Sequence, residues 1–201
     1  MNKLASKLSP SITSMIKFDH THVIATFHQY RTENSAMNKQ GLVNTACVAL
    51  EIHSQLEEEI FYPAMRAVMP SDPTLAESVP EHDEMRRLIM RLRGMHPDDA
   101  QYDATFMELI RDVLHHVADE ETILLPMAEK LLGPRLGELG AEMTKRRLQL
   151  VAPRAGEIAG NMARGMPATS MLMAAGALLA GTYFVTRGST RRAQSEPATT
   201  H

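Results

Sequence analysis

Two stretches of the chain carry the same arrangement of histidine, glutamate and proline. Residues 53–63 read HSQLEEEIFYP, and residues 116–126 read HVADEETILLP. In each stretch glutamates occupy the fourth and fifth positions after a histidine, and an isoleucine and a proline follow at matching offsets. Residues four apart share one face of an α-helix, so each stretch presents an imidazole and a carboxylate on the same side.

The repeat includes a further histidine before each stretch. His20 lies 33 residues before His53, and His82 lies 34 residues before His116. An acidic residue directly precedes both His20 and His82. One pair of helices is therefore used twice, which predicts two equivalent half-sites that face each other across a bundle axis.

Four segments show the periodicity of amphipathic helices. Their inner positions recur at alternating steps of three and four residues, the spacing of one buried helical face. The composition agrees with helices, since aromatic residues make up only 4% of the chain while methionine occurs 15 times. The predicted inner positions are Ile12, Ile16, His20, Val23 and Phe27; Ala46, Leu50, His53, Glu57, Ile60 and Ala64; Leu75, Val79, His82, Met85, Ile89 and Leu92; and Leu109, Val113, His116, Glu120, Ile123 and Met127.

Short breaks separate the four segments. Short connections between long helices place neighbouring helices antiparallel, so the expected fold is all-α, an antiparallel up-down four-helix bundle over residues 12–133. Residues 134–165 are expected to form a C-terminal helical extension. The breaks, which are polar or rich in glycine and proline, are residues 34–41, 70–73, 94–99 and 133–134.

Histidines and glutamates interrupt the apolar faces of these helices. A buried glutamate is costly unless it is paired or bound to a metal, and no lysine or arginine occupies the inner positions near Glu57 and Glu120. Imidazole together with carboxylate suits iron, zinc or manganese better than calcium or magnesium. Six such side chains exceed the needs of one zinc ion and agree with two iron ions bridged by the carboxylates and an oxide or hydroxide. The predicted metal ligands are His20, His53, Glu57, His82, His116 and Glu120.

Neighbouring residues of the same type are expected to have other roles. Glu58 and Glu121 lie about 100° further round their helices, so they are predicted to support the ligands from behind or to face solvent. His115 is the alternative to His116 in register, and the repeat favours His116. The histidines without a repeat partner are expected to face solvent, namely His22, His28, His96 and His201.

Three further residues of the repeated stretches carry expectations. Pro63 and Pro126 lie inside helical segments and are expected to kink the helices or to end their first part. Tyr62, beside Pro63, is expected to be a core side chain rather than a redox-active one.

These features resemble the hemerythrin-like, or HHE cation-binding, family. The likeness covers roughly residues 12–150 and rests on the two repeated stretches together with KFDH at residues 17–20 and EH at residues 81–82. The resemblance implies a non-haem di-iron centre that binds oxygen or a related small ligand. It also implies that the four predicted histidines are terminal ligands and that the two glutamates are bridging carboxylates.

The chain departs from the oxygen-carrying hemerythrins at one position. Those proteins have a further histidine one turn after the third-helix ligand, where this chain has Arg86. One iron ion therefore lacks a nitrogen ligand, and its position is open, filled by water or filled by another side chain. The difference argues against reversible oxygen carriage. It favours ligand activation, peroxide chemistry, nitric-oxide chemistry or iron handling, because an open site lets exogenous molecules reach the metal. The Glu-x-x-His motif of ferritin-like bundles occupies no inner face here.

Three functions share the predicted ligand set and stay open at this point. The first is a di-iron protein that binds or senses O2 or a related ligand such as NO or peroxide. The second is a di-iron oxidoreductase that disposes of peroxide or NO. The third is an iron store or donor for metal-centre repair.

Composition bears on partners and location. The formal net charge of −3 shows no domain-wide basic excess, and no nucleic-acid partner is predicted. Cys47 is the only cysteine, so no internal disulfide forms, as in reducing compartments. The first twenty residues lack the continuous apolar run of a secretory signal, so a cytoplasmic location is expected.

The C-terminal part of the chain differs from the bundle in composition. Residues 166–185 contain no charged side chain, and a helix of about 20 residues spans a bilayer core. Residues 166–186 are expected to form either a transmembrane helix that tethers the protein to the inner membrane or a helix that docks on another protein surface. Gly176 and Ala180 would allow close packing of two such helices in a homo-oligomer. Residues 1–11 form an N-terminal segment, and a disordered tail is predicted for residues 187–201.

Overall fold

The computed structural model describes residues 10–165 of the chain. The predictions for residues 1–9, for the apolar segment 166–186 and for the tail 187–201 lie outside this range. Between residues 10 and 165, no helix is both long enough and apolar enough to cross a membrane.

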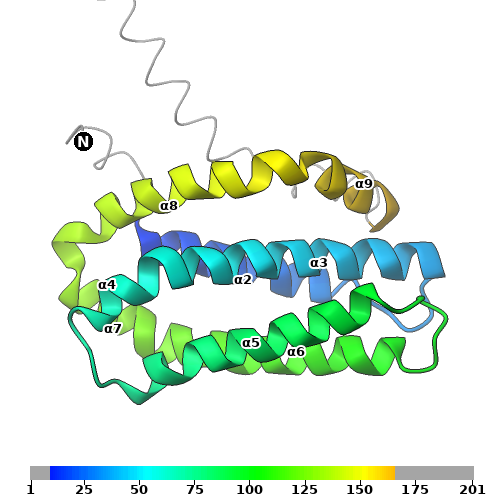
Figure 1. Cartoon of the computed structure of the whole chain (residues 1–201), viewed down its shortest axis with the longest axis horizontal. Helices are drawn as coiled ribbons and strands as arrows, with labels where there is room; N and C mark the ends of the chain where they lie inside the picture. Colours follow the sequence, from blue (N-terminus) through cyan, green and yellow to red (C-terminus); the bar gives the residue numbers. More distant parts are fainter. Residues whose placement is uncertain (1–9, 166–201) are drawn as a thin grey trace, which may run out of the picture.

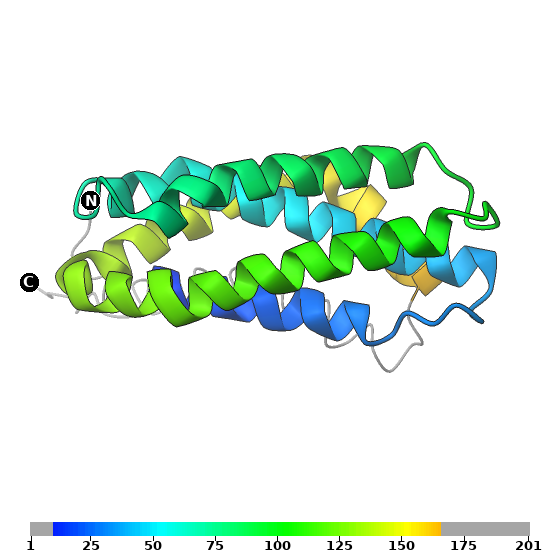
Figure 2. The ribbon, with the colours of Figure 1, turned by 90° about the horizontal axis from the view of Figure 1, so that it is seen from below.

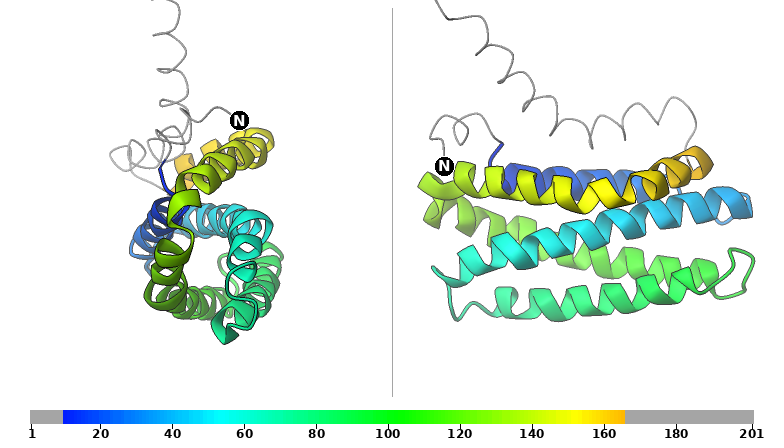
Figure 3. Two further views of the ribbon diagram at one scale, coloured as in Figure 1. Left: turned by 90° about the vertical axis from the view of Figure 1, so that its left-hand side faces the viewer. Right: turned by 45° about the horizontal axis from the view of Figure 1, so that its top comes forward.

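Four long helices form the body of the molecule. Consecutive helices run in opposite directions along the long axis (Figures 1 and 2), and the end-on view shows that they close into a ring (Figure 3). The prediction of an all-α, up-down four-helix bundle is confirmed. The helices are α2 (Ile12–Phe27), α3 (Ala36–Leu56), α5 (Pro73–Arg93) and α6 (Tyr102–Asp119).

The break predicted over residues 34–41 is shorter in the structure. The hydroxyl of Ser35 accepts a hydrogen bond from the amide of Asn38 (3.3 Å) and caps α3, which begins at Ala36. Gly41 therefore lies inside the helix, where its missing side chain leaves room for the backbone of Gly165.

Each repeated stretch contains one turn of π-helix. Wider turns of this kind are frequent at functional sites. In each case the turn starts at a predicted ligand, Glu57 or Glu120. The turn η1 (Glu57–Phe61) follows α3 and leads into α4 (Tyr62–Arg66), while η2 (Glu120–Leu124) follows α6 and leads into α7 (Leu125–Leu131).

The two prolines come directly after these π turns. The amide of Tyr62 donates to the carbonyl of Glu57, five residues back, and the following residue, Pro63, has no amide hydrogen to continue the α-helical ladder. Leu125 and Pro126 repeat the arrangement in the second stretch. The prolines thus accompany a local change of helical pitch, after which each helix continues.

The π turn shifts the buried face of the fourth helix by one residue. Ile123, predicted as an inner position, is 39% exposed, whereas Leu124 is fully buried. The prediction for Ile123 is wrong because a π turn holds one more residue than the α-helical spacing assumes. In the first stretch both Ile60 and Phe61 are buried, because a fifth helix packs over η1.

The C-terminal extension lies outside the ring. It runs along α2 and α3 (Figure 3). The extension consists of η3 (Gly133–Arg135), α8 (Leu136–Val151), η4 (Ala152–Arg154) and α9 (Ala155–Gly165).

Two apolar clusters fill the two ends of the bundle. One contains Ile12, Leu56 and Leu124, and the other contains Phe27 and Phe106. The predicted ligands lie in the layer between the clusters, because the antiparallel helices bring the middle of each one to the same height. A polar layer is therefore enclosed by hydrophobic packing on both sides.

Candidate metal centre

The structure brings the six predicted ligands together in the middle of the bundle. Each side chain belongs to a residue that is at most 8% exposed. One ligand atom from each member of a group lies within 4.8 Å of the others, in two groups that share Glu57. The groups are His20, His53, Glu57 and Glu120, and Glu57, His82 and His116.

Each glutamate lies between histidines from the two halves of the repeat. An oxygen of Glu57 is 3.1 Å from Nε2 of His53 and 3.5 Å from Nε2 of His82. Glu120 takes the matching position, 3.2 Å from Nε2 of His20 and 3.6 Å from Nε2 of His116. A carboxylate that serves two neighbouring metal ions needs this placement.

Several polar atoms in the middle of the cluster lack hydrogen-bond partners. Four buried atoms of the cluster have no hydrogen bond with acceptable geometry, namely Nε2 of His20, Nε2 of His53, Oε1 of Glu57 and Oε2 of Glu120. Buried polar groups are almost always satisfied, so four orphaned atoms at one place indicate a missing partner. Imidazole nitrogens and carboxylate oxygens are suitable ligands for iron, zinc or manganese, and the residues present fit such ions.

Burial also changes the protonation of the cluster. Desolvation, together with the nearby charge of Glu120, raises the pKa of Glu57 well above its usual range. Desolvation and the neighbouring His20 lower the pKa of His53 to about 4. His53 is therefore neutral near pH 7 and keeps a lone pair for a metal. The ionised form of Glu57 is disfavoured, and a nearby cation would stabilise it.

Four carboxylates support the histidines from outside the cluster. Each lies near Nδ1 of one histidine, which leaves Nε2 directed at the middle of the cluster, as is common for metal-binding histidines. Glu58 and Glu121 take the supporting role, one of the two predicted for them. The pairs are Asp19 with His53 (3.4 Å), Glu58 with His82 (2.9 Å), Glu81 with His116 (2.6 Å) and Glu121 with His20 (2.9 Å).

The roles of Asp19 and Glu81 were not predicted from the sequence. The signal is present there, since an acidic residue precedes the histidine of α2 and that of α5. The partner is not the adjacent histidine, however, but the one on the following helix. Only the packing of the helices shows this pairing.

The hydroxyl of Tyr62 reaches into the cluster. It donates a hydrogen bond to Oε1 of Glu120 (2.9 Å) and lies 3.3 Å from Nε2 of His82. The residue is fully buried, as predicted, but its hydroxyl contacts the predicted ligands, which the sequence did not indicate. Burial and the charge of Glu57 raise the pKa of Tyr62 well above its usual range, so the phenol stays protonated in the metal-free protein.

Arg86 does not enter the metal cluster. Its guanidinium donates to Glu58 (2.8 Å) and to Asp83 (2.8 Å), and so contacts a supporting carboxylate from the solvent side. The space beside His82 is taken instead by the hydroxyl of Tyr62. Tyr62, and not Arg86, therefore supplies the additional polar group that contacts His82 inside the cluster.

The remaining histidines divide into exposed and half-buried ones. The side chain of His115 is 72% exposed, which agrees with the choice of His116 by the repeat. His28 and His96 are exposed as expected. His22 is half-buried and lines a cavity, so the prediction that it faces solvent is wrong; burial lowers its pKa. His201 lies outside the described residues.

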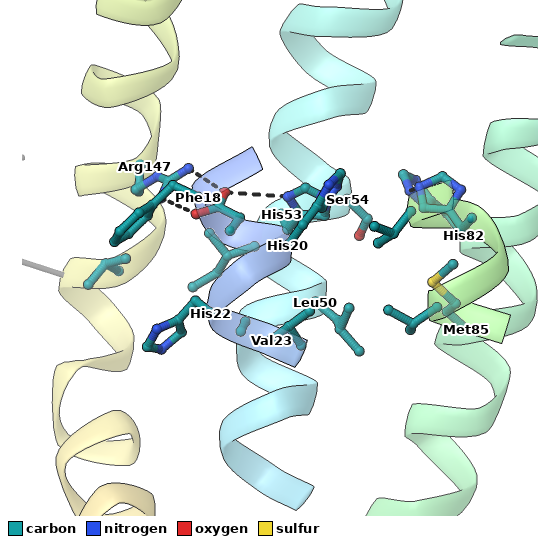
Figure 4. Close-up of a pocket in the computed structure, with 17 residues that line it drawn as sticks. Phe18, His20, His22, Val23, Leu50, His53, Ser54, His82, Met85 and Arg147 are labelled. Carbon is teal, nitrogen blue, oxygen red and sulfur yellow. Dashed lines mark hydrogen bonds and ion pairs between the residues drawn. The ribbon is translucent and has the colours of Figure 1, made fainter. Parts of the chain in front are cut away.

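A cavity of about 80 Å³ connects the cluster with the side of the bundle that α8 covers. All four histidines of the cluster line it. Figure 4 shows Arg147, Phe18 and His22 at the α8 side of this cavity and His82 at the opposite side. The cavity is large enough for a diatomic or triatomic molecule beside the histidines.

Comparisons with known proteins found a matching family and a named relative. A segment of 120 residues, 60% of this chain, is 27% identical to a protein of Nostoc sp. (strain PCC 7120) named DNA nickase. The chain spans about a third of that relative, since the match covers 34% of its length. No solved structure matches. Residues 11–128 match the hemerythrin HHE cation binding domain. The chain therefore belongs to the hemerythrin HHE cation-binding family.

Proposed function

We propose that this protein holds two iron ions in the bundle and binds or senses O2 or a related small ligand such as NO or peroxide. The observation that supports it most is the pair of ligand groups that share Glu57. A single ion would need only one of the groups. Two ions would satisfy the orphaned atoms of His20, His53, Glu57 and Glu120.

Each group of residues would have its own role in holding the two ions. His20 and His53 would hold one ion and His82 and His116 the other, with Glu57 and Glu120 between them. When bound, a pair of iron ions supplies redox chemistry and ligand-binding positions. The supporting carboxylates fix the imidazole tautomers, and the apolar clusters at both ends keep bulk water away from the centre.

The cavity beside the histidines supports small ligands over larger substrates. Its volume of about 80 Å³ accommodates a few heavy atoms and no organic cofactor. A space of this size favours a molecule of two or three atoms as the ligand.

The two alternatives from the sequence use the same centre. A di-iron oxidoreductase would turn over peroxide or NO there, and an iron donor would lose iron readily to an acceptor. The DNA-directed activity in the name of the Nostoc relative concerns a protein of which only 34% is matched, and no feature of the cluster favours it here. A cytoplasmic location and the absence of a nucleic-acid partner stay predictions.

The decisive experiment is a metal analysis with an optical spectrum. Protein purified without oxygen is expected to contain about two iron ions per chain and to develop azide-dependent absorption bands after oxidation. A stable oxygen adduct would identify a binding protein, and consumption of peroxide or NO would identify an enzyme. Fast loss of iron to a chelator would identify a donor, whereas a single zinc ion per chain would contradict the di-iron centre.

A further inference from the structure

One side of the candidate metal centre is covered by a fifth helix. α8 packs along α2 and α3, the helices that carry His20 and His53 (Figure 3). Ile52, beside His53, is 9% exposed, whereas the side chain at the equivalent position of the second half, His115, is 72% exposed. The cover lies beyond residue 128, where the match to the family ends.

Arg147 of α8 connects this cover to a predicted ligand. Its guanidinium makes two hydrogen bonds to the carboxylate of Asp19, at 2.6 and 2.5 Å. The same carboxylate lies 3.4 Å from Nδ1 of His53 (Figure 4). Paired, charge-assisted bonds of this kind fix the orientation of both groups. The side chains of Arg147 and Asp19 are only 19% and 17% exposed, so water screens the pair weakly.

Arg147 also forms part of the wall of the cavity. It lies at the α8 end together with Phe18, His22 and Val151, and the histidines of the cluster lie further in. Its Nε is buried without a hydrogen-bond partner. Because Arg147 lines the cavity, its displacement would remove part of the wall between the histidines and α8.

The extension is held against the bundle at both ends. Near the start of α8, a Cβ atom on Gly140 would lie 2.0 Å from the carbonyl oxygen of Pro10, so the two backbones touch. At the end of α9, Gly165 lies against Gly41 in the same manner, and Asn38 donates to the Gly165 carbonyl (2.9 Å). Contacts that only glycine permits indicate that the extension packs against the bundle in one defined position.

We propose that α8 contributes to the metal centre and that Arg147 is a positioning residue, which orients Asp19 and, through it, His53. Arg147 holds Asp19 on His53 and closes the cavity toward solvent, so it sets the rate at which small molecules reach the His20–His53 side. This inference rests on the proposed function, because access to the histidines matters only if they hold a metal. The access itself can be measured on the protein without metal.

The first test uses the metal-free full-length protein and needs no iron. Diethyl pyrocarbonate acylates neutral imidazole nitrogen, and peptide mass spectrometry reports each histidine separately. Arg147→Ala is expected to accelerate labelling of His20 and His53 by about ten-fold, the scale set by one partly buried, charge-assisted pair. Labelling of the exposed His96 calibrates the reagent.

The matched control is Arg146→Ala. Arg146 is the neighbour of Arg147 on α8 but pairs with Glu59 (2.6 Å), away from the cavity. Its replacement is expected to leave the labelling of His20 and His53 unchanged. Arg147→Lys keeps one charge without the two parallel bonds and is expected to give an intermediate rate.

The second test uses metal-loaded protein and follows azide binding and metal release to a chelator. Arg147→Ala is expected to increase both rates by about ten-fold and to shift the azide band, while Arg146→Ala changes neither. Equal labelling and equal release in the Arg147→Ala and Arg146→Ala variants would overturn the inference. Absence of iron from the parent protein would instead contradict the proposed function, and the labelling of the metal-free protein would still decide the role of Arg147.

Discussion

The α2–α3 half and the α5–α6 half of the bundle carry the same motif in different surroundings. In the first half, Asp19 supports His53 and is itself held by Arg147 of α8. In the second half, Glu81 supports His116, and no described lysine or arginine pairs with it. A duplicated sequence thus builds two similar sets of predicted ligands whose outer environments differ, because α8 packs along α2 and α3.

A second difference lies next to the glutamates. Tyr62 follows His53 by nine residues, and the residue at the same offset from His116 is Leu125. Both side chains are fully buried, but only the tyrosine places a hydroxyl against His82 and Glu120. The predicted ligand sets are therefore nearly symmetric, but the tyrosine hydroxyl contacts them on one side only.

The largest effect is expected from the residue that the two groups share. Glu57→Gln removes the carboxylate charge shared by the two proposed metal positions, so the protein should lose most of both ions, with affinity lowered about a hundred-fold. Metal analysis after equilibrium dialysis measures this. Retention of one full ion would show that the two positions are independent and that Glu57 does not bridge them.

Next in size is the loss of one histidine from each half. His53→Ala and His116→Ala should each lower metal affinity about ten-fold or more, and to a similar degree, because the repeat makes the two residues equivalent. Parallel metal titrations of the two variants compare them directly. A loss confined to one variant would break the equivalence of the halves, and parent-like metal content in both would remove them from the ligand set.

The supporting carboxylates Asp19 and Glu81 should differ in how much each contributes to the free energy of unfolding. Asp19→Asn leaves Arg147 with an uncompensated, largely buried charge, so it should lower the free energy of unfolding by about 2 kcal/mol more than Glu81→Gln does. Urea unfolding of the metal-free proteins near pH 7 measures this difference. Equal destabilisation would show that Arg147 contributes nothing specific to the first half.

The pH dependence of the same pair has a defined sign. Despite burial, the hydrogen bond from His53 and the charge of Arg147 lower the pKa of Asp19 from 3.8 to about 2. A lowered carboxyl pKa adds stability that is present above pH 3.8 and is lost as the pH falls toward 2. The stability advantage of the parent protein over Asp19→Asn should therefore shrink across this interval.

A smaller effect is expected where α8 meets the start of the bundle. Gly140→Ala forces a Cβ against the Pro10 carbonyl and should lower the free energy of unfolding by about 1.5 kcal/mol. Gly156→Ala is the matched control, since nothing lies within 4 Å of its Cβ position, and it should be neutral or slightly stabilising. Identical melting temperatures for the two variants would contradict the tight seat of α8.

The smallest effect is expected from the tyrosine hydroxyl. Tyr62→Phe keeps the packing and removes one hydrogen bond to Glu120, which corresponds to about 1 kcal/mol. The metal content should stay near that of the parent, while the optical bands of the azide complex should shift. An unchanged spectrum would mean that the hydroxyl does not contribute to the asymmetry of the centre.

The helical class, the four-helix arrangement and the six side chains that meet in the core could be predicted from the sequence alone. The reason is that helical periodicity and the internal repeat are local properties, and residues such as His53 and Glu57 share a face wherever the helix packs. The ligand role of the six residues stays a prediction, although the structure brings them together as expected.

The contacts between helices could not be predicted from the sequence, because they depend on how whole helices pack. The π turn moved burial from Ile123 to Leu124, and the carboxylates of Asp19 and Glu81 reached the histidine of the next helix rather than their own neighbour. The position of Arg147 over Asp19 depends on where α8 folds back, more than a hundred residues along the chain. Periodicity assigns a residue to a face, but the rotation and packing of whole helices select its partner.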